Sequence, residues 1–193
     1  MPINTKETYY PRNQQEWREW LETNHSSKSS VWLIFYKKET QQPTIDWSEA
    51  VDEALCFGWI DSLKKKIDDE RYMQLFSKRK PNSTWSKINK DKVKVLIDEG
   101  RMTQAGLRTV VIARENGMWS FLDDVEKLII PDDLEIAFNK SNGSKEFFLS
   151  LTKSIRKGML AWIVMAKREE TRKKRISELV SAASKGEKPK PFM

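Results

Sequence analysis

The chain has 193 residues and a net charge of +7, with 38% hydrophobic residues and eight tryptophans. This composition supplies a hydrophobic core and excludes disorder of the whole chain. A single cysteine excludes an internal disulfide framework and favours a cytoplasmic location, and no apolar run approaches the roughly 20 residues that span a bilayer.

The first half of the chain alternates helix and strand patterns. Asp46 and Glu49 have the spacing of a capping box, so a helix begins there and ends at Gly58. Residues 30–37 are apolar on both faces, which predicts a central strand, and residues 59–77 predict two antiparallel strands joined by a turn.

After Gly100 the pattern is helical, apart from an ambiguous stretch at 119–128. The predicted fold class is therefore α+β, with a small antiparallel sheet packed with helices and then an all-helical C-terminal module. We divide the chain into an α+β domain at 1–117, a helical module at 118–184 and a flexible basic tail at 185–193.

Two basic blocks lie on a more acidic remainder. Residues 63–92 hold 10 basic and 4 acidic side chains, and residues 153–193 hold 12 and 4. Such blocks predict an anionic partner, which is an anionic small molecule, an acidic partner protein or nucleic acid.

Most of the unpaired polar chemistry lies around the first block. Polar and aromatic residues follow Gly58, and a basic loop then leads into the next helix, whose N-terminus presents free N–H groups to an anion. We predict a pocket for a small anionic or nucleotide-like ligand, with tryptophans as flat walls. Its residues are Trp59, Asp61, Ser62, Arg79, Lys80, Trp85, Ser86, Lys87 and Asn89. The alternative is that Asp61 pairs with Arg79 and both tryptophans are core.

The second block offers a different candidate interface. Its basic residues are Lys167, Arg168, Arg172, Lys173, Lys174 and Arg175. They predict a contact with nucleic acid or an anionic lipid, and the alternative is a solvated helix face on which acidic neighbours offset the lysines.

Catalytic and metal chemistry has little support in the sequence. One cysteine and one histidine cannot form a zinc site, and the acidic pairs at 123–126 and 132–135 are expected at helix starts without any metal. No cofactor motif is present, and Cys56 is predicted to be a buried structural thiol. We therefore favour a non-enzymatic protein, with an enzyme whose site lies near Asp61 and Arg79 left open as a further alternative.

The segment DWSEAVDEALCFGWIDS, at 46–62, resembles the signature of the YdeI/OmpD-associated (bacteriocin-protection) family of bacterial proteins. The resemblance continues at 79–81, 85–89 and 100–107, and it returns between Trp162 and Ile176. Ser77-Lys78 departs from the family, which usually has Thr-Pro before the Arg-Lys-Pro segment. The resemblance implies a role in stress or antimicrobial-peptide resistance, and it brings no established catalytic residues.

Overall fold

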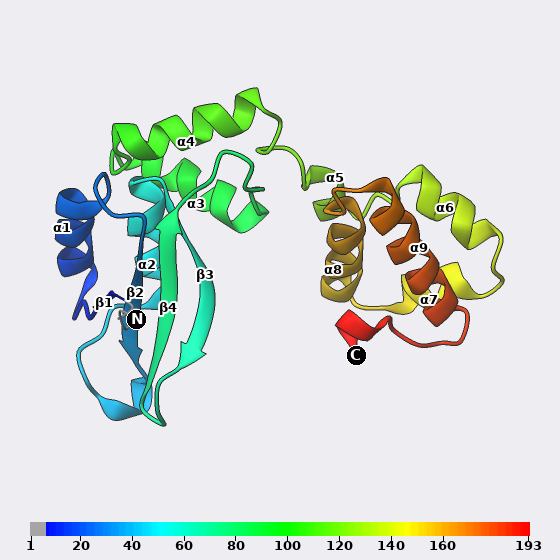
Figure 1. Ribbon diagram of the computed structural model, residues 1–193, viewed down its shortest axis with the longest axis horizontal. Helices are drawn as coiled ribbons and strands as arrows, with labels where there is room; N and C mark the ends of the chain where they lie inside the picture. Colours follow the sequence, from blue (N-terminus) through cyan, green and yellow to red (C-terminus); the bar gives the residue numbers. More distant parts are fainter. Residues whose placement is uncertain (1–6) are drawn as a thin grey trace, which may run out of the picture. The chain divides into compact units, whose positions relative to one another are not determined.

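The structure is a computed structural model that describes residues 7–193. The chain divides into two compact units between Ser120 and Phe121, three residues after the boundary suggested by the sequence (Figure 1). The first unit contains the sheet and the second contains only helices. The α+β fold class is therefore confirmed.

The sheet of the first unit has four strands in the order β1-β2-β4-β3. Their bounds are β1 Thr8–Tyr9, β2 Ser30–Tyr36, β3 Trp59–Lys66 and β4 Arg71–Lys78. β4 pairs antiparallel with β3, as predicted, and also with β2, whereas the two-residue β1 pairs parallel to β2 at one edge. The apolar β2 therefore lies inside the sheet, and the lysine-rich β3 forms the other edge, where charged side chains disfavour pairing with a further strand.

The helices of the first unit share a common hydrophobic core with one face of the sheet. They are α1 Gln14–Asn24, the short turn η1 Lys38–Thr40, α2 Trp47–Cys56, α3 Lys87–Asp98 and α4 Gln104–Glu115. Val31 and Phe76 lie opposite each other on neighbouring strands, so both side chains point to the same face, and both are buried with Trp17 of α1 and Ala54 of α2. Trp59 and Trp85 belong to this core as well.

The end of α2 fixes the position of α4. The backbone N–H of Asp46 donates to Glu49, as the capping-box spacing predicts, and Gly58 ends the helix with a φ of +74°. The hydroxyl of Thr103 then donates to the carbonyl of Cys56 at 2.7 Å. Gly106 packs so closely that an added Cβ would lie 2.3 Å from the same carbonyl oxygen. α4 is therefore held against the turn that leads into β3.

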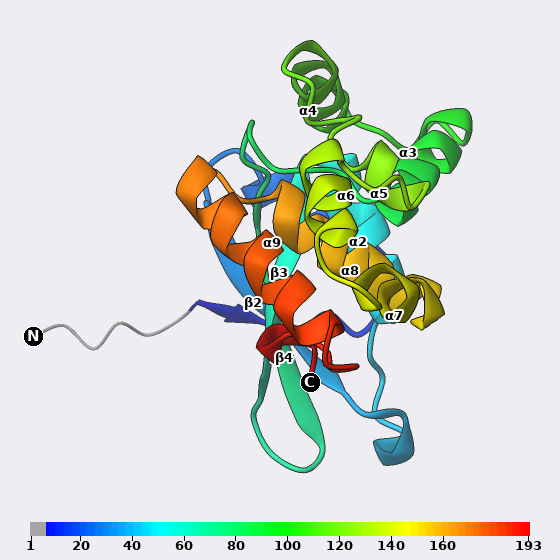
Figure 2. The ribbon, with the colours of Figure 1, turned by 90° about the vertical axis from the view of Figure 1, so that its right-hand side faces the viewer.

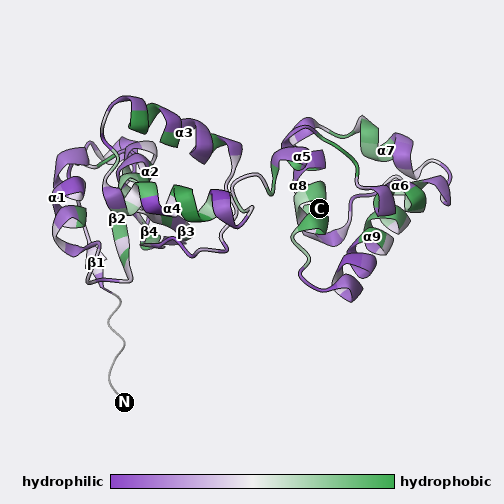
Figure 3. Cartoon of the chain, turned by 90° about the horizontal axis from the view of Figure 1, so that it is seen from above, coloured by the Kyte–Doolittle hydropathy of each residue, from purple (hydrophilic) through white to green (hydrophobic). Residues whose placement is uncertain are grey.

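The second unit is a bundle of helices around its own core (Figure 2). Its elements are α5 Asp123–Glu126, α6 Asp132–Asn139, α7 Ser144–Ser150, α8 Lys153–Val164, α9 Glu169–Ala183 and the final turn η2 Lys190–Phe192. Figure 3 shows polar and apolar residues alternating along α6 and α9, the pattern of helices that bury one face. Leu134, Phe138, Phe148 and Leu160 are among the buried residues.

The segment after α9, predicted to be a flexible basic tail, contacts the helical module. Pro189 is buried, and the ring of Phe192 packs edge-on against Trp162 with centroids 5.8 Å apart. The lysines and prolines of this segment suggested mobility, and that mobility stays a prediction.

Among residues 7–193, no helix has both the length and the apolar character that crossing a bilayer requires.

Candidate functional site

The turn at Gly58 and the segment at Arg79 lie next to each other. β3 begins after Gly58 and β4 ends before Arg79. Because these strands pair antiparallel, the start of β3 and the end of β4 lie at the same end of the sheet. The backbone N–H of Arg79 donates to the carbonyl of Gly58 at 2.9 Å. The fold thus brings together the two segments that the predicted pocket requires.

Arg79 is the most unusual residue of this cluster. Its side chain is buried, with 9% of the residue exposed, and its guanidinium carbon lies 3.6 Å from the centroid of the Trp85 ring. One terminal nitrogen, Nη2, donates to the carbonyl of Thr84. The other two nitrogens, Nε and Nη1, are buried without any hydrogen-bond partner. Burial lowers the pKa of Arg79 to about 10, against the raising influence of Asp61, so the side chain remains charged at neutral pH.

Asp61 does not compensate this charge by direct contact. Its Oδ2 accepts hydrogen bonds from Trp47 Nε1 at 3.1 Å and from Gln74 Nε2 at 3.0 Å. Among the described residues, no carboxylate oxygen lies within 4.0 Å of the Arg79 nitrogens. The ion pair between Asp61 and Arg79 that the alternative interpretation required is therefore not formed.

The two predicted tryptophan walls are part of the core. Trp59 is fully buried and its Nε1 donates to the carbonyl of His25, while Trp85 is 1% exposed and packs between Arg79 and Trp119. Neither ring offers an open face to a ligand. This part of the alternative interpretation agrees with the structure.

The other predicted site residues lie on β3 or on the loop and helix that follow Arg79, and several of their polar groups are used locally. Ser86 caps α3 by accepting a hydrogen bond from the backbone N–H of Asn89, and Lys87 pairs with Asp91 one turn later. Ser62 and Lys80 are exposed. Arg79 is therefore the residue of the cluster whose donors lack partners.

Trp119 extends the cluster and was not identified from the sequence, where its segment had no clear pattern. Its ring centroid lies 5.0 Å from that of Trp85, and the guanidinium of Arg114 lies over it at 5.1 Å. Trp119 and Arg114 line a hollow of about 310 Å³ together with Lys90 and Lys94 of α3. Asp91 and Asp98 line the hollow as well, so the stack that begins at Arg79 ends at a solvent-facing surface of mixed charge.

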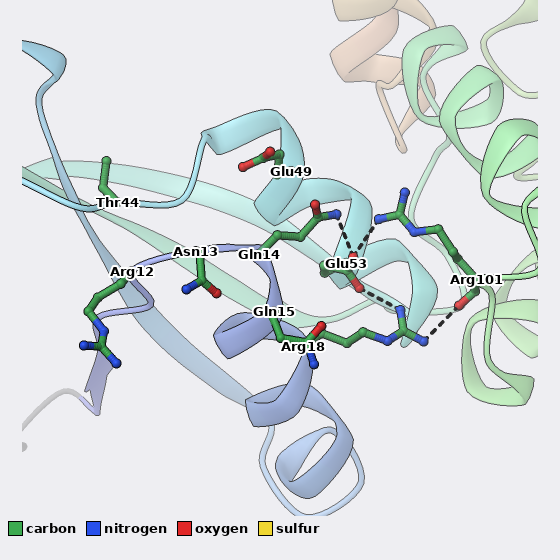
Figure 4. Close-up of a pocket in the computed structure, with 9 residues that line it drawn as sticks. All are labelled: Arg12, Asn13, Gln14, Gln15, Arg18, Thr44, Glu49, Glu53 and Arg101. Atoms are coloured by element: carbon green, nitrogen blue, oxygen red, sulfur yellow. Dashed lines mark hydrogen bonds and ion pairs between the residues drawn. The ribbon is translucent and has the colours of Figure 1, made fainter.

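A second polar site lies between α1 and α2, and it too escaped sequence analysis (Figure 4). Glu53, 2% exposed, forms the floor of a hollow of about 560 Å³. Its carboxylate accepts hydrogen bonds from Gln14 at 2.8 Å, Arg18 at 2.8 Å and Arg101 at 2.6 Å. The sequence signal was an acidic residue beside Ala54 and Ala50 on the apolar face of a helix.

Cys56 lies close to this network and has no features of a nucleophile. Burial raises its pKa to about 11, and the nearby charge of Glu53 acts in the same direction. The thiol is therefore protonated at neutral pH and is a structural side chain, as predicted.

Three of the six basic residues predicted as contacts at the start of α9 are engaged in interactions with other residues of the chain. Arg172 makes two hydrogen bonds to Asp133, at 2.6 and 2.8 Å, and Lys173 pairs with Glu169. Arg175 donates to the carbonyl of Trp162 and lies over its ring. The remaining three, Lys167, Arg168 and Lys174, are exposed.

Two family models match separate parts of the chain. Residues 9–109 match a domain of unknown function (DUF8412), and residues 127–186 match the family described as "Bacteriocin-protection, YdeI or OmpD-Associated". The second match is the family that the sequence resembles, although the segment 46–62 lies within the first. Searches of curated proteins and of solved structures found no match.

Proposed function

Because the chain belongs to the family of the DUF8412 domain and carries the bacteriocin-protection, YdeI or OmpD-associated module at 127–186, we propose that it is a binding protein whose N-terminal unit takes up a small anionic ligand at Arg79. The proposed setting is the cytoplasm, in stress or antimicrobial-peptide resistance. The words "bacteriocin protection" in the family description support the resistance part of this proposal.

The buried guanidinium of Arg79 with two unpartnered nitrogens is the observation that carries this proposal. Burial lowers the pKa of Arg79 to about 10, which corresponds to a cost of about 3 kcal/mol for burying the charged form. Stacking on Trp85 returns about 2 kcal/mol, and the hydrogen bond to Thr84 about 1 kcal/mol. The charge therefore adds almost nothing to stability, whereas the oxygens of a carboxylate or phosphate would satisfy both nitrogens.

The ligand has to displace part of the loop that follows Arg79, because both nitrogens are closed off from solvent. The loop is short and partly exposed. Two hydrogen bonds hold it, one from Arg79 to the carbonyl of Thr84 and one of 2.9 Å from Asn116 to the carbonyl of Pro81. An anionic oxygen that replaces the Thr84 carbonyl would break the first of these hydrogen bonds. This geometry favours a ligand with one small, compact anionic group.

The two alternatives have weaker support. A nucleic-acid interface on α9 would lack Arg172 and Lys173, whose charges are matched by Asp133 and Glu169. An enzyme at Asp61 would need a carboxylate free to act on substrate, and Asp61 already accepts two hydrogen bonds.

Thermal unfolding of the protein with a panel of anions tests the proposal. The probes are inorganic phosphate, citrate, AMP and GMP, and the variants are Arg79→Met and, as a matched control, Arg108→Met on the exposed side of α4. A probe that binds should stabilise the wild type and the control by about 2.7 kcal/mol at one hundred times its Kd. Arg79→Met should lose this response because the methionine keeps the packing over Trp85 but has no donors.

Two results would contradict the proposal. One is a panel in which no anion raises the melting temperature of the wild type, which would indicate that buried water satisfies Arg79. The other is an anion response that survives in Arg79→Met, which would place the site elsewhere.

A further inference from the structure

The segment after α9 turns back onto the helical module. Gly186 has a φ of +72°, and the N–H groups of Gly186 and Glu187 donate to the carbonyls of Ala183 and Ala182, both at 3.0 Å. This is the hydrogen-bond pattern of a helix that ends in a left-handed glycine, and it reverses the direction of the chain. Residues 187–193 therefore return to α8, where Phe192 meets Trp162 (Figure 1).

The surface of α8 is shaped for this aromatic ring. Gly158 and Trp162 are four residues apart and share one face of the helix. A Cβ added at Gly158 would lie 3.0 Å from Cε1 of Phe192, so the missing side chain is the space that the ring uses. Glycine is less favourable than alanine inside a helix, so its place here needs such a reason.

The indole of Trp162 is held in place independently of the tail. Arg175 of α9 donates to the carbonyl of Trp162, and its guanidinium carbon lies 5.3 Å from the centroid of the Trp162 ring. The floor of the site is thus built from α8 and α9 alone, and it does not depend on Phe192 for its arrangement.

The occupant has the features of a docked peptide. Pro189 is buried and has φ −62° and ψ 152°, the polyproline II conformation, and Pro191 restricts the next turn. Proline-rich segments lose little conformational entropy on docking into aromatic grooves. The family match ends at residue 186, so the floor belongs to the matched module and residues 187–193 do not.

We propose that Gly158 and Trp162 form a peptide-docking groove for an extended Pro-x-Pro-aromatic segment, which residues 187–193 occupy in cis. One docked aromatic ring on a segment of seven residues is a weak anchor, so the tail opens and a partner peptide of the same chemistry takes its place. Residues 187–193 then act as an intramolecular competitor that lowers the apparent affinity of the groove for such partners.

A binding experiment in trans tests this groove. A fluorescent peptide with the sequence of residues 187–193, EKPKPFM, is titrated with the full chain and with the chain shortened after Gly186, and fluorescence polarisation reports binding. The shortened chain should bind the peptide. The full chain should bind at least tenfold more weakly, because its own tail competes at an effective concentration in the millimolar range. A peptide with Phe192→Ala should lose at least tenfold in affinity.

Gly158→Ala in the shortened chain separates docking from folding. The added Cβ should raise the melting temperature, because alanine favours the helix, and should weaken peptide binding at least fivefold, because it occupies the space of the ring. If the shortened chain does not fold, full-length Phe192→Ala takes its place as the acceptor. A folded acceptor that does not bind the peptide overturns the proposal, as does a full chain that binds equally well. A full chain that forms dimers by exchanging tails would show that the occupant is a second copy, which also overturns it.

Discussion

Glu53 and Arg79 are both buried charges of the first unit, and their surroundings differ in one respect. Glu53 receives hydrogen bonds from Gln14, Arg18 and Arg101, whereas Arg79 has one protein partner and two unpartnered nitrogens. A charge whose partners all come from the fold joins those parts of the fold together. A buried charge whose hydrogen-bond donors lack partners within the chain is the better candidate for binding an external partner. We therefore assign the hollow at Glu53 to the scaffold and keep Arg79 as the proposed ligand site.

The largest predicted effect tests the structural role of Glu53. Glu53→Gln removes the charge that balances two arginines, and we expect the free energy of unfolding to fall by about 3 kcal/mol. This is at the low end for a broken buried pair, because Arg18 and Arg101 keep the exposed partners Glu22 and Glu99. Urea denaturation measures the change.

The matched control is Glu22→Gln, which removes the exposed partner of Arg18 and should cost less than about 0.5 kcal/mol. A loss below about 1 kcal/mol for Glu53→Gln would show that the network is not structural, and the hollow in Figure 4 would then compete with Arg79 as the ligand site.

Local signals explain what the sequence predicted. The capping pair of Asp46 and Glu49, the left-handed Gly58 and the apolar run of β2 act within a few residues, so the helices and the sheet follow from them. The same signals placed the Gly58 turn and the Arg79 loop at the ends of paired strands. That is why the two parts of the candidate site were found together.

The features that the sequence missed depend on contacts between distant residues. Gln14 and Arg101 reach Glu53 across 39 and 48 positions of the chain, and no local pattern identifies such partners. Ile88 is apolar but 67% exposed, because α3 buries the face that carries Val93 and Leu96. Phe192 was hidden in a segment whose lysines and prolines are typical of a mobile tail.

The second prediction concerns Arg79 itself. Arg79→Met should change the free energy of unfolding by less than about 1 kcal/mol, because the cost of burying the charge and the contacts that it makes nearly cancel. Urea denaturation of the ligand-free protein near neutral pH is the measurement. A loss above about 3 kcal/mol would make Arg79 a structural residue like Glu53.

The pH dependence of the Arg79 contribution has a defined sign. The pKa is lowered to about 10 in the folded state, so the cost of the buried charge is fully present below pH 10. Above about pH 10 the folded protein loses this proton before the unfolded chain does, and the contribution of Arg79 becomes more favourable. Arg79→Met should remove this rise in stability relative to the wild type.

The smallest predicted effect is the coupling between Asp61 and Arg79. Asp61→Asn preserves an oxygen for the hydrogen bonds from Trp47 and Gln74, and it removes only the charge that raises the pKa of Arg79. A double-mutant cycle with Arg79→Met isolates this interaction. Because no direct ion pair exists, the coupling free energy should be below about 1 kcal/mol, whereas a direct buried pair would give several kcal/mol. A large coupling would mean that the carboxylate of Asp61 already balances the charge of Arg79. The reason to expect an external anion there would then disappear.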